Sequence, residues 1–294
     1  MTSSNNGNEP LVTIITLCYN TGKLVLDTMR SIKNQYYKNT EHIIIDDCSK
    51  DDSVELINGW IKANKHNCTF ICHTENKGIC SSVNEALSLS NGKYVFFCGD
   101  DLLLPDKIQG DITFLEENPD CAFVHSRSIV RNMATGEETP LYYKNNESQQ
   151  PFKDFIKGKL AISTVTVVYR RKVFDEVGYY DESFILEDFD MFLRILNKHK
   201  IGYRKIFSMI YCRHPGNISA TRPNDITADI FRIMKKWSHL PNFAIYQLYR
   251  KQLAFYNVAD RNKKEALKYL FPSLLLFWRK TLYASLYKFF FVWR

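Results

Sequence analysis

The sequence predicts an α/β fold in which a mixed, mostly parallel sheet is flanked by helices, with a helical region at the C-terminal end. Short apolar runs alternate with helical patterns over about the first two thirds of the chain, which is typical of a sheet wound on both faces. Residues 224–294 follow a helical pattern. The expected organisation is a polar, disordered lead-in at 1–9, an α/β domain at 10–219 and a helical region at 220–294.

Four strand-like runs define the first half of the predicted domain. They are residues 11–18, 41–46, 69–73 and 93–97. Their near-continuous apolar character is typical of parallel strands that are buried on both faces. Helical patterns at 24–33, 54–64 and 78–89 connect them, and Ser53 is expected to cap the second helix. Because the loops that follow parallel strands form the ligand crevice, polar residues in these loops are the candidate site.

The second half contains fewer clear strands. The expected elements are a helix at 106–117, a strand at 122–130, a polar surface loop at 133–150, a strand at 163–170 and a short helix at 171–177. Pro105 at the start of the first helix and Gly178 after the last one are typical boundary residues.

Charge and cysteine content narrow the class of protein. The net charge is +7, but residues 1–203 carry 22 Lys/Arg and 28 Asp/Glu, whereas 204–294 carry 17 and 4. A body of net charge −6 with an end of +13 is unlike a nucleic-acid enzyme and suits a domain whose end binds an anionic surface. The eight cysteines, mostly in apolar runs, are typical of reduced thiols in a cytosolic protein. Cys68, Cys72 and His73 lack the spacing of a zinc knuckle.

Several loop residues carry possible chemistry. The strand at 93–97 is followed by Asp100 and Asp101, two carboxylates that repel each other unless a cation such as Mg²⁺ lies between them. Tyr19 can stack on a planar base, and Asp47 can accept a ring N–H. The alternatives are solvated acids in a turn, an aromatic cap on the sheet and an acid at a helix N-terminus.

Three later segments contain further candidate residues. Glu187, Asp188 and Asp190 begin an apolar helix, where they either act chemically or complement the helix dipole. His214 lies in a basic turn and either reaches a ligand or is an ordinary loop residue. Residues 271–294 mix aromatic and basic side chains, which favours an interfacial helix over a membrane-spanning one. Packing on the catalytic domain or in a homodimer is the alternative.

Four motifs resemble the family 2 glycosyltransferases, which have the Rossmann-like GT-A fold, and in particular those of bacterial surface polysaccharides. The motifs are VTIITLCYN at 12–20, IIIDDCSKDDS at 43–53, NKGICSSVNEAL at 76–87 and GKYVFFCGDD at 92–101. They occur in the family's order, and the resemblance extends from residue 11 to about 215. It implies an inverting glycosyltransferase with a nucleotide-sugar half at about 10–105 and an acceptor half at about 106–219.

The resemblance also implies roles for individual residues and partners. A nucleotide-sugar donor, UDP-linked by expectation, would contact Leu17, Tyr19, Asp47, Asn76, Gly78 and Asp100. Mn²⁺ or Mg²⁺ would be held by Asp100, Asp101 and His214. The catalytic acids would be Asp188 as the base, with Glu187 and Asp190 as the neighbouring candidates. The expected acceptor is a glycan or lipid-linked glycan, and the expected location is the cytoplasm, peripheral on the inner face of the cell membrane.

The sequence departs from the family pattern at two places, and it leaves two alternative functions open. Val83 stands where the family often has an Arg, and Cys98 and Gly99 precede Asp100 where many relatives have a further Asp. A catalytically inactive relative that only binds nucleotide-sugar is one alternative. A nucleotidyltransferase is the other, although residues 18–23 are a poor version of a glycine-rich phosphate loop.

Overall fold

The computed structural model describes residues 9–143 and 145–292, and the chain divides into two compact units. The first unit contains the described residues up to Tyr143 together with Ile162–Thr221. The second contains residues 145–161 together with Arg222 and the described residues after it. Apart from Glu9, the predicted lead-in lies outside the described residues.

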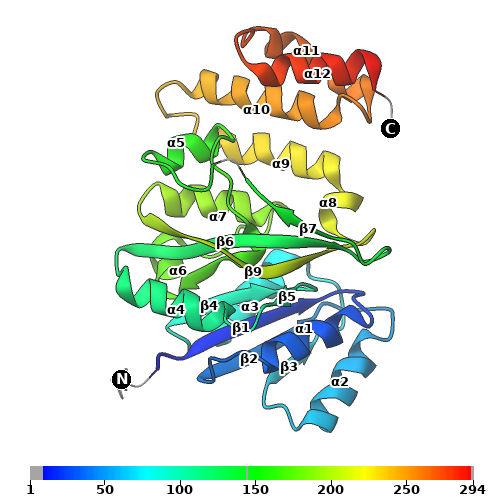
Figure 1. The fold of residues 1–294 in the computed structure, drawn as a ribbon, viewed down its shortest axis with the longest axis vertical. Coiled ribbons are helices and arrows are strands. Elements are labelled where there is room, and N and C mark those ends of the chain that lie inside the picture. Colours follow the sequence, from blue (N-terminus) through cyan, green and yellow to red (C-terminus); the bar gives the residue numbers. More distant parts are fainter. Residues whose placement is uncertain (1–8, 144, 293–294) are drawn as a thin grey trace. The chain divides into compact units, whose positions relative to one another are not determined.

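The described residues of the first unit contain a nine-stranded sheet (Figure 1). Its strands are β1 (Val12–Cys18), β2 (Thr40–Asp46), β3 (Thr69–Cys72), β4 (Tyr94–Cys98), β5 (Leu102–Leu103), β6 (Cys121–Asn132), β7 (Glu138–Leu141), β8 (Val168–Arg170) and β9 (Lys200–Arg213). The order in the sheet is β3-β2-β1-β4-β8-β6-β9-β5, and β7 pairs with β6.

The strand directions confirm a mixed, mostly parallel sheet. The first four strands, β1 to β4, run parallel to one another. β8 lies antiparallel between β4 and β6, β5 is antiparallel to β9, and β6 and β9 run parallel. β6 and β9 therefore run in the same direction as β4, and the C-terminal end of β9 reaches the acids that follow β4.

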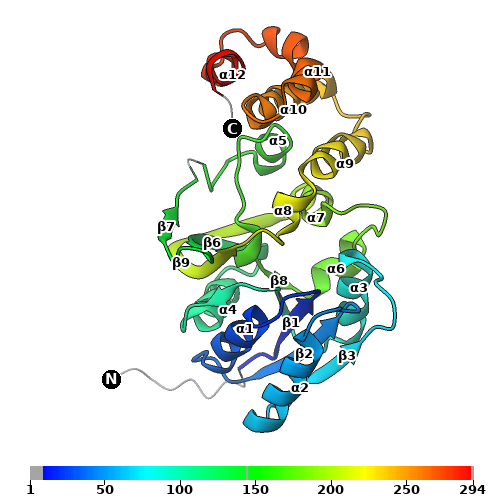
Figure 2. The ribbon, with the colours of Figure 1, turned by 90° about the vertical axis from the view of Figure 1, so that its right-hand side faces the viewer.

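Helices cover both faces of this sheet. They are α1 (Leu24–Lys33), α2 (Ser53–Asn64), α3 (Ile79–Leu89), α4 (Lys107–Glu117), α6 (Lys172–Val177) and α7 (Glu187–Leu196). The short α8 (Ile218–Thr221) has no buried residue. Figure 2 shows α1 and α4 on one side of the sheet and α3 and α6 on the other. Apolar strand residues such as Ile14, Ile44 and Phe96 are fully buried beneath these helices, so burial of apolar surface stabilises both layers.

One sequence prediction about a helix cap is wrong. Ser53 is the first residue of α2, and its side chain makes no cap hydrogen bond within that helix. Its hydroxyl instead accepts the amide of Thr21 at 3.1 Å and that of Gly22 at 2.8 Å. The residue thereby ties α2 to the loop after β1.

Two strand and loop boundaries also differ from the prediction. Residues 163–170 contain a 3₁₀ turn at Thr164–Thr166, and only Val168–Arg170 is a strand. The Thr166 hydroxyl donates to the Ser163 carbonyl at 2.8 Å, and such local side-chain bonds compete with strand pairing. The predicted loop at 133–150 includes β7, which pairs with β6.

The second unit is helical, as predicted for the C-terminal region. It contains α5 (Pro151–Ile156), α9 (Pro223–Lys235), α10 (Phe243–Val258), α11 (Lys263–Leu274) and α12 (Lys280–Phe291). Phe255, Ala259, Ala266 and Leu282 form its small core. The Lys263 ammonium donates to the carbonyls of Lys288, Phe289 and Val292, so it satisfies acceptors that α12 leaves open at its end.

The surface of α11, α12 and the residues between them is rich in exposed apolar side chains. The exposed residues are Leu267, Phe271, Leu274, Leu275, Phe277, Trp278, Tyr283, Tyr287, Phe290 and Phe291. Among the residues that the structure describes, no helix has both the length and the apolar composition needed to cross a bilayer.

Candidate active site

The candidate active site lies at the carboxyl edge of β1, β2 and β4. Cys18 of β1 pairs with Asp46 of β2, and Thr16 pairs with Cys98 of β4. The loops that leave these strands therefore start side by side, where open α/β sheets bind ligands. The predicted donor residue Leu17 is half-buried near the end of β1.

Asp47, the first residue after β2, is nearly saturated with hydrogen bonds. It is 7% exposed, and its carboxylate accepts the amides of Lys77 and Gly78, each at 2.8 Å. His73 Nδ1 lies 2.8 Å from Oδ1, the oxygen that also accepts the Lys77 amide. A carboxylate offers about four acceptor positions. Of these donors, only the Gly78 amide binds Asp47 Oδ2. One acceptor position therefore remains on Oδ2.

The turn before α3 is shaped around Asp47. The Asn76 side-chain amide donates to the Asp47 carbonyl at 3.1 Å. Gly78 has φ +86°, a backbone conformation that glycine adopts without the steric cost of a Cβ. The predicted residues Asn76 and Gly78 thus lie against Asp47, and they act on it through the side-chain amide and the backbone.

The loops after β1 and β2 are fastened to each other. The Asn20 amide donates to the Ser49 hydroxyl at 2.8 Å, and Asn20 Oδ1 accepts the Lys50 amide at 2.7 Å. Asp46 is fully buried and accepts the Ser49 amide at 2.8 Å and its hydroxyl at 2.6 Å. Tyr19, which precedes Asn20, is 51% exposed, so its ring is available to a planar ligand.

Asp100 and Asp101 have different surroundings although they are adjacent. The Asp100 carboxylate is hydrogen-bonded to His214 Nε2 and is partly exposed. His214 is held in turn by Asn217, whose Oδ1 accepts the His214 amide at 2.7 Å. Asp101 is 6% exposed and accepts the Cys212 amide at 2.8 Å. Burial, followed by the charge of Asp100, raises the pKa of Asp101 to about 8.

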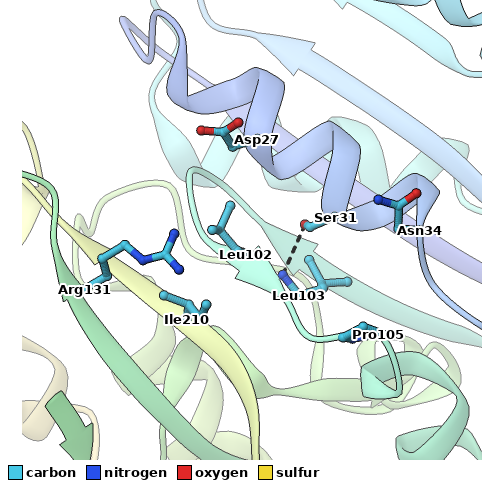
Figure 3. Close-up of a pocket in the computed structure, with 8 residues that line it drawn as sticks. All are labelled: Asp27, Ser31, Asn34, Leu102, Leu103, Pro105, Arg131 and Ile210. Atoms are coloured by element: carbon cyan, nitrogen blue, oxygen red, sulfur yellow. Dashed lines mark hydrogen bonds between the residues drawn. The ribbon is translucent and has the colours of Figure 1, made fainter. Parts of the chain in front are cut away.

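Helix α1 supports the loop that carries these acids. Thr28 donates its hydroxyl to the Asp101 carbonyl at 3.0 Å, and the Ser31 hydroxyl accepts the Leu103 amide at 3.1 Å. The Ser31 contact borders a pocket of about 400 Å³ (Figure 3). Its lining residues are Asp27, Ser31, Asn34, Leu102, Leu103, Pro105, Arg131 and Ile210. None of them is a predicted site residue, so this pocket lies beside the candidate site.

The three acids predicted as catalytic lie in the first turn of α7. Asp190 is 1% exposed and pairs with Arg194 at 2.9 Å, while Arg194 donates to the carbonyls of residues 177–179. Asp190 therefore stabilises the loop before α7. Glu187 and Asp188 are half-buried. Burial raises the pKa of Asp188 to about 6, so this carboxyl group is mostly ionised at pH 7.

Helix α3 holds the segment that leads to these acids. Asn84 accepts the Tyr180 amide at 2.9 Å and donates to the Tyr180 carbonyl and to Glu182, each at 3.0 Å. The Cys80 thiol donates to the Phe184 carbonyl at 3.1 Å. The helix that starts at the turn around Asp47 thus anchors the chain that precedes Glu187 and Asp188.

A divalent cation fits the Asp100–His214 pair. Within the described residues, no group of three His, Cys, Asp or Glu side chains is arranged to enclose a metal ion. Asp100 and His214 nevertheless bring a carboxylate oxygen and an imidazole nitrogen together. Mg²⁺ typically takes one or two protein carboxylates and completes its shell with waters and substrate phosphates. The pair fits such an ion when a diphosphate supplies further oxygen ligands.

The fold is similar to that of GT-A glycosyltransferase structures. TarS 1-349 from S. aureus, solved with UDP-GlcNAc, has a TM-score of 0.60 at 18% identity, covering 82% of this chain and 70% of that one. A mannosyltransferase from Pyrobaculum calidifontis, solved with GDP-Man and Mn²⁺, has a TM-score of 0.57 at 16% identity, covering 97% and 88%. At these identities the likeness concerns the fold.

The chain belongs to Glycosyl transferase family 2, whose profile matches residues 13–178. It is 30% identical over 221 residues to UDP-Glc:alpha-D-GlcNAc-diphosphoundecaprenol beta-1,3-glucosyltransferase WfaP of Escherichia coli, covering 72% of this chain and 81% of that protein. Other relatives are named for bacterial polysaccharide synthesis, and the chain spans only 45% and 43% of the length of two of them. The resemblance found in the sequence is confirmed.

The departures from the family pattern lie in buried positions. Val83 is 4% exposed within α3, and Cys98 is 3% exposed at the end of β4. Sequence reasoning missed His73 and Asn84, which hold Asp47 and the segment before α7. His73 is the first residue after β3, and the pairing of Asp46 with Cys72 sets it beside Asp47. A search for polar residues directly after each strand finds it.

Proposed function

We propose that this glycosyltransferase is an inverting, metal-dependent enzyme that transfers a sugar from a UDP-linked donor to a hydroxyl group of a glycan or lipid-linked glycan. The observation that supports this most strongly is that Asp47 and the Asp100–His214 pair follow β2 and β4, the two strands that flank β1, while α3, which begins at the turn around Asp47, holds the segment before α7. The names of WfaP and the TarS complex, which include UDP-Glc and UDP-GlcNAc, support the choice of donor.

The donor base would be recognised by Asp47. The remaining acceptor position on Oδ2 suits one ring N–H, which uracil has at N3. Tyr19 would stack on the base, and Leu17, Asn76 and Gly78 would complete the pocket around it. Because Val83 is buried and uncharged, it adds no cationic contact to the donor.

The diphosphate would be bound through Mn²⁺ or Mg²⁺ held by Asp100 with His214. When bound, the ion neutralises the charge that develops on the leaving diphosphate. Asp101 supports this arrangement indirectly, because its carboxyl group fixes the loop to the Cys212 amide. We therefore propose Asp100 as the carboxylate that contacts the ion.

Asp188 would act as the general base. Its carboxylate takes the proton of the acceptor hydroxyl as the oxygen attacks the anomeric carbon, and the bond from that carbon to the UDP oxygen breaks. Attack from the face opposite UDP inverts the anomeric centre in a single displacement. A pKa of about 6 suits a base that works near neutral pH. Glu187 would lie beside the reacting groups, and Asp190 would keep α7 in place.

We further propose that the second unit attaches the enzyme to an anionic membrane, on the inner face of the cell membrane. The exposed aromatic residues between Phe271 and Phe291 share their segment with Arg279, Lys280 and Lys288. Aromatic and basic side chains together bind anionic lipid surfaces. Such a position would bring the enzyme to a lipid-linked acceptor. A second copy of the chain is the alternative partner of this surface.

Calorimetry with nucleotides tests the donor proposal. Wild-type protein with Mn²⁺ should bind UDP more tightly than CDP, because cytosine has an acceptor at N3 where uracil has a donor. Asp47→Asn should reduce this preference for UDP. Equal binding of UDP and CDP by the wild type would contradict the role of Asp47. Tighter binding of UTP than of UDP or UDP-sugar would favour the nucleotidyltransferase alternative.

An activity assay separates an enzyme from an inactive relative. Slow hydrolysis of UDP-sugars, or transfer to a lipid-linked GlcNAc acceptor, should require Mn²⁺ or Mg²⁺. Protein that binds UDP-sugars in the presence of metal but neither hydrolyses nor transfers any of a panel would be the inactive relative. The anomeric configuration of a transferred sugar, read by NMR, tests inversion directly.

Vesicle sedimentation tests the membrane proposal. Binding to vesicles that contain phosphatidylglycerol should weaken with salt and fall several-fold for the double variant Phe277→Ala, Trp278→Ala. Tyr36→Ala, at an exposed aromatic residue of the first unit, is the matched control and should bind as wild type does. A concentration-dependent dimer that the double variant abolishes, with unchanged vesicle binding, would assign the surface to a second copy instead.

A further inference from the structure

His73 connects two carboxylates at the edge of the sheet. It follows β3, is 8% exposed, and its amide donates to the Asp46 carbonyl at 2.9 Å. Its Nδ1 lies 2.8 Å from Asp47 Oδ1, and its Nε2 lies 3.1 Å from Glu85 Oε2. Both ring nitrogens are therefore engaged, one by the loop after β2 and the other by α3.

The contacts of His73 close into a ring through Lys77. The Lys77 ammonium donates to the same Glu85 oxygen at 3.1 Å, and the Lys77 amide donates to Asp47 Oδ1 at 2.8 Å. The Lys77 ammonium, together with the His73 hydrogen bond, lowers the pKa of Glu85. Each member of the ring is thus held by two others, and the turn before α3 is fixed relative to Asp47.

We propose that His73 is a positioning residue for recognition of the donor base. It occupies Asp47 Oδ1 together with the Lys77 amide, so the carboxylate presents Oδ2 to the ligand in one orientation. This inference rests on the proposed function, in which Asp47 accepts a ring N–H. Groups fixed before binding lose less conformational freedom when the ligand arrives, so His73 strengthens binding of bases that have that N–H.

A buried histidine in the neighbouring strand offers a contrast. His42 lies four residues before Asp46 on β2, and its ring nitrogens contact Thr16 at 2.8 Å and His66 at 2.9 Å. It is as buried as His73 but contacts no carboxylate in these interactions. His42→Gln is therefore a matched control for loss of a buried imidazole within the same sheet.

The test is the ratio of UDP to CDP affinity, measured by calorimetry with Mn²⁺. His73→Phe should weaken UDP binding about tenfold or more and leave CDP binding nearly unchanged, because cytosine lacks the N–H. His73→Asn, which can offer its amide near the position of Nδ1, should retain most of the UDP affinity. His73→Gln, whose amide reaches toward the position of Nε2, should behave like His73→Phe. His42→Gln should keep the wild-type ratio.

The possible failures are distinguishable. If wild-type protein binds UDP and CDP equally, the proposed role of Asp47 fails, and the inference about His73 fails with it. If the wild type prefers UDP and every His73 variant keeps that preference, the inference alone is overturned. If His73→Phe does not fold, the comparison of His73→Asn with His73→Gln tests the inference instead. A purely structural role of His73 predicts the same ratio of UDP to CDP affinity for these two folded variants.

Discussion

Two pairs of adjacent aspartates end parallel strands in this molecule, and they are arranged in opposite order. At the end of β2, the first acid, Asp46, is the buried last residue of the strand, and the second, Asp47, lies next to His73. After β4, the first acid, Asp100, contacts His214, and the second, Asp101, is buried. In both pairs one carboxylate fixes a loop and the other faces a histidine.

The difference between the pairs lies in the donors around the acid that faces the histidine. Backbone amides of Lys77 and Gly78 bind both oxygens of Asp47, which leaves room for a single directed hydrogen bond. Asp100 is hydrogen-bonded to a side chain, that of His214, and stays partly exposed. Amide-rich surroundings suit recognition of a neutral ring, whereas a more open carboxylate suits a hydrated cation. In the proposed function both pairs bind the donor or its cation, and the base for the acceptor is proposed to come from α7.

The largest effect is expected for Asp188→Asn, which tests this division of roles. The variant keeps the side-chain size but cannot take a proton, so transfer should slow by at least about a hundredfold, with UDP binding unchanged. The wild-type rate should fall as the pH drops below about 6, because the Asp188 carboxyl group becomes protonated. Steady-state kinetics from pH 5 to 8 measure both effects.

Glu187→Gln is the matched control for Asp188→Asn and should retain most of the rate. Near-wild-type transfer by Asp188→Asn, with the low-pH loss of rate preserved, would exclude Asp188 as the base. Glu187 would then be the next candidate.

The second-largest effect is expected on Mn²⁺-dependent UDP binding, when the two acids after β4 are replaced one at a time. Asp100→Asn should weaken Mn²⁺-dependent UDP binding by at least about tenfold, with little change in melting temperature. Asp101→Asn keeps an oxygen that can accept the Cys212 amide, so the Mn²⁺-dependent part of the UDP affinity should stay close to wild type. Calorimetry with and without Mn²⁺ measures this part. The reverse pattern would make Asp101 the metal ligand.

Much of this edge could be predicted from the sequence, but the orientation of each acid could not. The apolar runs that end at Cys18, Asp46 and Cys98 locate the strand ends, and the polar residues just after them form the candidate site. The period-two alternation of a strand stops at its last residue. It therefore says nothing about which of Asp100 and Asp101 turns inward, since that depends on the distant Cys212 amide.

Pairings between distant segments were also beyond sequence reasoning. The contact between His73 and Asp47 depends on the register of β2 with β3. The 3₁₀ turn at Thr164–Thr166 interrupts a run of β-branched residues typical of a strand, and the Thr166 hydroxyl within it accepts the distant Ser126 amide at 2.9 Å. Residues of the right type were visible in each case, but the partner that selects their conformation lies far away in the chain.

A third effect concerns the stability of the segment that precedes α7. Asn84→Ala removes its three hydrogen bonds and leaves the amide and carbonyl of Tyr180 without these partners. The free energy of unfolding should fall by about 1–3 kcal/mol. Asn58→Ala is the matched control, because the Asn58 amide is exposed and bonds only within its own helix. Urea denaturation measures both, and equal losses would mean that Asn84 is not an anchor.

The smallest expected effect is a pH dependence of stability caused by His42, which differs in this from the histidines that face carboxylates. Burial, with the neighbouring His66, lowers the pKa of His42 to about 3, whereas an unfolded histidine titrates near 6.5. Between these values the unfolded state binds a proton that the folded state does not. Stability is therefore lost as the pH falls below about 6.5, by up to about 1.4 kcal/mol per pH unit.

His42→Gln should remove this contribution, so its denaturation midpoint should depend less on pH between 7 and 5 than that of the wild type. His239→Gln, at an exposed histidine of the second unit, should leave the dependence unchanged. An identical pH dependence for wild type and His42→Gln would show that His42 is protonated in the folded protein.

The position of β9 has a consequence for biosynthesis. Cys212 and His214, the partners of Asp101 and Asp100, are more than a hundred residues further along the chain. As the ribosome extends the polypeptide, β1 to β4 can pair early, but the acids after β4 acquire their partners only when β9 has emerged. Such sequence-distant pairing slows folding. A nascent chain that ends before residue 212 would therefore contain the surroundings of Asp47 but not the partners of Asp100 and Asp101.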